Sequence, residues 1–145
     1  MRPLRNFDEF VNEGIIRKQS PDKSRATSLI EESKNSYKVL TKIIKEIKVD
    51  DSNANYIIKN SYDIIMELIR AKMILDGFKS SGEGAHEAEI SCLRKLSFSE
   101  AEVQFANQLR YFRNGIVYYG KSFDEDYARK VLQFLDKIYR KLATK

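Results

Sequence analysis

Apolar residues recur at three- and four-residue steps along most of the chain, and this spacing limits the fold more than any other feature of the sequence. In residues 21–48 they mark one buried helical stripe. In residues 54–76 they are dense enough for a helix that packs on several sides. The two-residue alternation of a half-buried strand is absent from the pattern. The sequence therefore predicts an all-α fold with the helix of residues 54–76 at its centre.

Capping signals and glycine-containing stretches place the other helices. Capping boxes begin at Ser99 and at Ser122. The Gly and Ser residues of 77–84 predict a flexible connection, because both residue types favour turns. We expect an antiparallel up-and-down bundle of four or five helices, with a short N-terminal helix laid across it, as one domain over residues 1–145. The predicted helices span residues 6–18, 21–48, 54–76, 86–96, 99–118 and 123–143.

Composition limits where the protein works and what it binds. The 145 residues, 42% of them hydrophobic, suffice for one core without disulfide or metal cross-links. Cys92 is the single cysteine, and neither a signal-type segment after Met1 nor a membrane-length apolar run is present. We therefore expect a cytoplasmic protein that does not bind a membrane. The formal net charge of +5 mildly favours an anionic partner, although acidic and basic residues are interspersed.

The sequence motifs of most cofactor-dependent enzymes are absent. There is no P-loop, no dinucleotide-binding glycine motif, no paired-cysteine zinc motif and no serine nucleophile elbow. One His and one Cys cannot supply the four ligands of a structural Cys/His zinc site within one subunit. We therefore expect neither a cofactor nor a metal.

Residues 109–120 concentrate arginine, tyrosine and glycine at the end of an apolar helix. An arginine can donate two hydrogen bonds to one phosphate, and a tyrosine ring can stack on a base. The segment therefore predicts a nucleotide-binding site. A structural alternative is open, because Arg and Tyr also lie at the rims of helix bundles with only their polar ends in water. The residues expected to contact a nucleotide or RNA are Arg110, Arg113, Asn114, Tyr118 and Tyr119.

Residues 113–120, with the sequence RNGIVYYG, resemble the signature of HEPN domains, in which an Arg is followed by a His with four to six residues between them. Residues 62–75 and the loop after them look like the second helix and connecting loop of that family, so the resemblance spans roughly residues 20–142. It implies an antiparallel helix bundle, usually a homodimer, in which the signature residues of both subunits line a cleft. In active members that cleft cuts RNA without a metal.

Arg113 matches the signature Arg, whereas Tyr118 occupies the first position at which the His would stand. A phenol, with a reference pKa of about 10, is a poor base at neutral pH, and an imidazole titrates near about 6.5. Some HEPN proteins with a Tyr here look like binding partners of small nucleotidyltransferases, which makes a nucleotidyltransferase a further expected partner. Gly120 stands where active members carry an adenylylated Tyr, so we do not expect that regulation.

The spacing adds a geometric expectation. On an unbroken helix Arg113 and Tyr118 would lie about 140° apart and would not meet. Their convergence would need a helix break near Asn114 and Gly115, or a twofold axis that brings in a second subunit. His86 is the only imidazole in the chain and an accessory candidate for acid–base chemistry, although a His at the start of a helix more often serves packing.

Three functions from different classes follow. The leading one is a non-catalytic, homodimeric module that binds RNA or a nucleotide, alone or with a nucleotidyltransferase. The second is a metal-independent ribonuclease of the toxin type, as in toxin–antitoxin pairs, in which Arg113 acts with Tyr118 or His86. The third is a structural bundle whose apolar helix faces serve only protein association.

Overall fold

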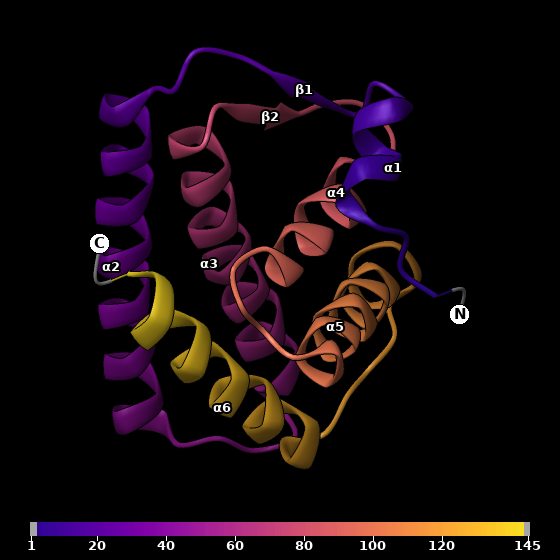
Figure 1. Cartoon of the computed structure of the whole chain (residues 1–145). Helices are drawn as coiled ribbons and strands as arrows, with labels where there is room; N and C mark the ends of the chain where they lie inside the picture. Colours follow the sequence, from indigo (N-terminus) through magenta and orange to yellow (C-terminus); the bar gives the residue numbers. More distant parts are fainter. Residues whose placement is uncertain (1–2, 144–145) are drawn as a thin grey trace.

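Six α-helices make up most of the chain from residue 3 to residue 143, the part that the computed structural model describes (Figure 1). Two strands of three residues and a short 3-10 helix complete the described part. The helical bundle expected from the sequence is confirmed. In chain order the elements are α1 (Phe7–Asn12), β1 (Ile16–Lys18), α2 (Lys23–Ile47), α3 (Ala54–Leu75), β2 (Phe78–Ser80), α4 (Ala85–Ser91), the 3-10 helix η1 (Cys92–Arg94), α5 (Glu100–Tyr119) and α6 (Glu125–Leu142).

Helix α3 lies at the centre of the bundle. Thirteen of its 22 residues are buried, which only a helix covered on several sides allows. Figure 1 shows α2 running antiparallel to α3 on one side, and α4 and α5 on the other. Helix α6 packs across α3 obliquely. The dense apolar pattern of residues 54–76 therefore predicted the central helix correctly.

A small antiparallel sheet lies at two places where the sequence predicted a helix and a flexible connection. The helix predicted at 6–18 ends early, because α1 stops at Asn12. The connection predicted at 77–84 is partly a strand: β2 pairs with β1, with Ile16 opposite Ser80, Arg17 opposite Lys79 and Lys18 opposite Phe78. Strands of three residues are too short to show a two-residue alternation in the sequence. The sheet holds the N-terminal segment beside the start of α4.

Three helix boundaries differ from the expectation. The helix predicted at 86–96 is divided, because α4 ends at Ser91 and the 3-10 helix η1 follows. The capping box at Ser99 is confirmed, whereas Asp124 instead of Ser122 caps α6. The helix break near Asn114 and Gly115, one of two ways considered to bring Arg113 and Tyr118 together, is absent: α5 continues to Tyr119, and the left-handed Gly120, with a φ of 65°, ends it.

A buried ion pair joins α3, α4 and β2. The Arg70 guanidinium donates from Nε and Nη2 to the two carboxylate oxygens of Glu89, at 3.0 and 2.9 Å. Ser80 of β2 donates its hydroxyl to the same carboxylate at 2.6 Å. Glu89 is only 3% exposed, so these three donors replace the water that its charge has lost. The network fixes α4 against α3 and therefore sets the position of the residues at the start of α4.

Replacing Glu89 by Ala should lower the free energy of unfolding by about 3 kcal/mol, because Arg70 would stay partly buried without its counter-charge. Urea unfolding followed by circular dichroism measures the loss. The control is Glu31→Ala, which removes an exposed pair with Lys34 and should cost under about 1 kcal/mol. Equal losses in the two variants would contradict the structural role of Glu89.

Candidate functional site

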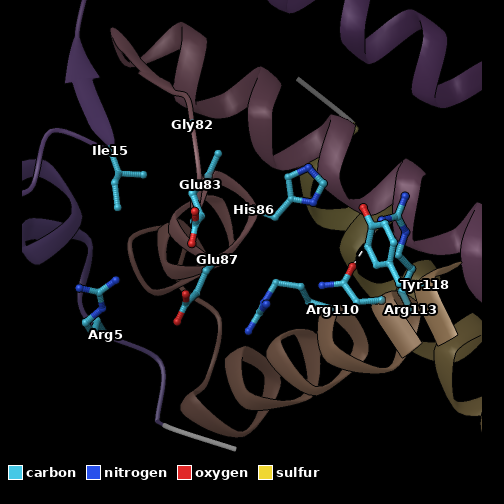
Figure 2. Close-up of a pocket in the computed structure, with 12 residues that line it drawn as sticks. Arg5, Ile15, Gly82, Glu83, His86, Glu87, Arg110, Arg113 and Tyr118 are labelled. Atoms are coloured by element: carbon cyan, nitrogen blue, oxygen red, sulfur yellow. Dashed lines mark hydrogen bonds between the residues drawn. The ribbon is translucent and has the colours of Figure 1, made fainter. Parts of the chain in front are cut away.

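The residues singled out in the sequence meet at a pocket of about 680 Å³. Figure 2 shows its three sides: the N-terminal segment with Arg5 and Ile15, the loop and first turn of α4 over residues 82–87, and α5. Four of the five predicted contact residues line it, together with His86. The four are Arg110, Arg113, Asn114 and Tyr118.

The α5 residues of the pocket lie on one face of an unbroken helix. Arg113 and Tyr118 stand at the two edges of an arc about 140° wide, with Arg110 and Asn114 between them. The pocket is wide enough to receive all four side chains. The two side chains therefore lie at opposite edges of the pocket, as their spacing on an unbroken helix predicts, and neither a helix break nor a second subunit is needed for both to line it.

Arg110 is held without being neutralised. Its Nε and Nη2 donate to the Asn107 side-chain oxygen at 3.1 and 3.0 Å. Within the described part of the chain, no carboxylate oxygen lies within 4.0 Å of its guanidinium. Because an amide carries no charge, this hydrogen bond orients the Arg110 guanidinium at the pocket without neutralising it.

Arg113 is held by an aromatic ring. Its guanidinium carbon lies 5.3 Å from the centre of the Tyr62 ring, within the range of a cation–π interaction. One guanidinium nitrogen lies 3.8 Å from the Asp63 carboxylate, a long contact to a group that is 61% exposed. This exposed carboxylate is hydrated and compensates the charge only in part. Arg113 thus adds a second cationic group to the wall of the pocket.

His86 reaches the same pocket from the first turn of α4, and the buried Tyr62 hydroxyl lies 3.1 Å from its Nδ1. Burial lowers the pKa of His86 below its usual value, and the charges of Arg70, Arg113 and Arg110 lower it further, against Glu89. Burial also raises the pKa of Tyr62, so its phenol stays protonated. We therefore assign the hydrogen bond as Tyr62 donating to a neutral imidazole, which leaves the proton of His86 on Nε2.

The N-terminal side of the pocket is fixed by Arg94 of η1. Its guanidinium donates to the backbone carbonyls of Arg5 and Leu4, at 2.7 and 3.0 Å, and forms an ion pair with Glu100 at 2.7 Å. These bonds hold the extended segment that carries Arg5. The Arg5 side chain pairs with Glu13, so much of its charge is already compensated.

Sequence reasoning missed three groups of the site. Tyr62 fits the apolar pattern of α3 and gave no sign that its hydroxyl and ring meet the pocket residues. Glu83 and Glu87 add acidic groups opposite α5, in a stretch read only as a loop and a helix start. Tyr119, by contrast, was predicted as a contact residue and does not line this pocket; it lines a neighbouring groove of about 700 Å³.

Among residues 3–143, no group of three or more His, Cys, Asp and Glu side chains is placed to hold a metal ion. None of the helices that the structure describes is both long and apolar enough to cross a membrane.

Comparisons of the chain with protein-family models, with curated proteins and with solved structures found no match. The resemblance to HEPN domains therefore stays a prediction from the sequence of residues 113–120 and its surroundings.

The protonation of His86 can be measured directly, because all imidazole signals in the proton NMR spectrum come from this single histidine. We expect a pKa below about 6.5, from burial and the neighbouring arginines. Arg113→Met removes one of those charges and should raise it, whereas Arg129→Met on α6, paired with Glu125, should not. In the parent protein, the lowered pKa means that the unfolded chain is protonated at a higher pH than the folded chain. The free energy of unfolding should therefore fall as the pH drops below about 6.5. A pKa at or above that value would refute the assigned environment.

Proposed function

We propose that the pocket binds the phosphate groups of a nucleotide or of RNA, and that the protein is a non-catalytic nucleotide- or RNA-binding module. The observation that carries the proposal is that Arg110 and Arg113 lie on the same wall of the pocket. Among the described residues, Arg110 has no carboxylate partner. Oriented guanidinium groups suit the oxygens of a phosphate, because each can donate two parallel hydrogen bonds.

The rest of the pocket suits a nucleotide better than an inorganic anion. Its volume of about 680 Å³ lies in the range of small-molecule sites. Glu83 and Glu87 can accept hydrogen bonds from ribose hydroxyls or base amino groups, and the Tyr118 ring, 68% exposed, can stack on a base. Phosphate alone would gain nothing from the two carboxylates, which would repel it.

The hydrogen bond of His86 favours binding over catalysis. With Nδ1 accepting from Tyr62, the proton sits on Nε2, and His86 can donate to a phosphate oxygen but cannot take a proton there. A general base at Nε2 would need the other tautomer, which would leave the buried Tyr62 hydroxyl without an acceptor. The same proposal includes a homodimer, a nucleotidyltransferase partner and a cytoplasmic location. These three parts rest on the sequence alone.

A second candidate function is metal-independent cleavage of RNA. It is favoured by one observation, that an imidazole and Arg113 line the same pocket although Tyr118 replaces the signature His. His86 would remove the proton of a ribose 2′-hydroxyl, the 2′-oxygen would attack phosphorus, and the 5′-oxygen would leave with a proton from water. Arg113 would stabilise the charge that grows on the phosphate oxygens.

Fluorescence anisotropy with labelled single-stranded and structured RNA, in EDTA and at two salt concentrations, tests the binding proposal. Arg110→Met should weaken binding at least tenfold at low salt, because a charge-assisted contact to phosphate is worth about 1.5–3 kcal/mol. The slope of log affinity against log salt should fall by roughly 0.7, the value for one phosphate on a single strand. Arg129→Met makes the same charge change on α6 and should weaken RNA binding less than threefold. Equal losses of affinity in the two variants would mean that the binding depends only on net charge.

The same incubations, analysed on a denaturing gel, test cleavage. The binding proposal predicts intact RNA in EDTA for the parent protein. Cleavage that is lost in both Arg113→Met and His86→Gln would establish the second candidate instead. Cleavage that survives both variants would indicate a contaminating nuclease, because neither residue could then take part.

A further inference from the structure

We infer that the groove beside the pocket is a base-stacking subsite, so that the ligand is a single-stranded nucleic acid of several nucleotides instead of a mononucleotide. The inference rests on the proposed function, since it extends the phosphate site along α5. The groove of about 700 Å³ shares Asn114 and Tyr118 with the pocket. Its other side chains that carry the argument are Tyr111, Phe112, Tyr119, Lys121 and Phe123.

Three largely exposed tyrosines lie along this path. Tyr111, Tyr118 and Tyr119 are 57%, 68% and 78% exposed, although burial of an aromatic ring is strongly favourable. Within residues 3–143, the rings of Tyr118 and Tyr119 stack on no other ring. Exposed apolar surface of this kind marks a binding surface. Stacking on bases uses ring faces of just this sort, whatever the base.

The floor of the groove is fixed. Phe112 packs against Phe123 with ring centres 4.8 Å apart and against Tyr127 at 5.3 Å. Asn55 of α3 holds the segment after α5 by donating to the Lys121 carbonyl at 2.9 Å and accepting from the Phe123 amide at 3.0 Å. The tyrosines therefore stand on a rigid platform, which lowers the entropy lost when a strand binds.

Charge selects nucleic acid over a second copy of the chain as the occupant. Among the described residues, the groove is lined by Lys121 and by no carboxylate. It continues into the pocket in which Arg110 and Arg113 face Glu83 and Glu87 across from α5. A twofold pairing of the groove with its own copy would bring the Lys121 side chains of two subunits together without a carboxylate from the groove to separate them. A strand of nucleic acid instead brings one negative charge with each base, so the phosphates meet Lys121 and the arginines while the bases meet the rings.

The arrangement also selects single strands. Bases in a duplex are stacked on one another, so only an unpaired strand can place its bases on the tyrosines. Two neighbouring cavities of about 680 and 700 Å³ exceed what one nucleotide fills. RNA and DNA share this chemistry, and both belong in the test.

The test compares two probes on the full chain. Calorimetry with ADP measures the affinity of the pocket alone. Fluorescence anisotropy with labelled single-stranded RNA and DNA octanucleotides measures the affinity of the pocket and the groove together. The double variant Tyr111→Ala, Tyr119→Ala should weaken octanucleotide binding at least tenfold, because one stacked base is worth about fivefold or more. Its affinity for ADP should change less than twofold. Both side chains are largely exposed, so the fold should survive their truncation.

Controls separate this inference from the proposed function. Tyr56→Ala truncates a tyrosine that is 45% exposed in a different groove, between α2 and α3, and should leave both affinities unchanged. Arg113→Met should weaken ADP and octanucleotide alike. If the double variant binds octanucleotides as the parent does while Arg113→Met weakens both probes, the groove is not a stacking site and the proposed function stands. If neither probe binds the parent, the proposed function fails and this inference with it.

Two further outcomes are informative. A duplex of the same sequence should bind at least tenfold more weakly than the single strand, and equal binding would overturn the inference. Sedimentation of the parent and of the double variant reads the oligomeric state. A dimer that the double variant dissociates, without a change in octanucleotide affinity, would assign the groove to self-association instead.

Discussion

The burial of α3 is the constraint on which the rest of the structure depends. Polar groups that a helix covered on several sides carries inward are stabilised by partners inside the protein, because an unpaired buried donor or charge is costly. Arg70 pairs with Glu89, which also accepts a hydrogen bond from Ser80, and the Tyr62 hydroxyl is hydrogen-bonded to His86. Both partners on α4 are therefore fixed relative to α3, and the pocket lies where α4, so placed, faces α5.

Tyr62 links the buried side of α3 to the pocket. Its hydroxyl sets the tautomer and orientation of His86, while its ring supports the Arg113 guanidinium. Two residues of the pocket, from two different helices, are thus positioned by one side chain that is 1% exposed. The site depends on the packing of the core, and a change that loosens α3 should disturb both groups together.

The sequence predicted the long helices well because they bury wide apolar stripes, and it located Arg110, Arg113, Asn114 and Tyr118 because they crowd one short segment. It could not show that His86 joins them, since that meeting depends on how α4 packs on α3. The helix does not break at Gly115, and the reason is local. Glycine only permits a break, and the apolar face of α5 continues to Ile116, which is 8% exposed and keeps the helix in place.

The hydrogen-bond partner of Arg110 supports the proposal that the pocket binds an anion. A carboxylate at position 107 would hold the guanidinium with stronger bonds, but it would also cancel the charge and compete with a phosphate. Asn107, only 1% exposed, orients the same group and leaves its charge for a ligand. A purely structural arginine would gain from a charged partner, as Arg70 does with Glu89. A cation that is oriented and left uncompensated has its natural counterpart in an anion from outside the chain.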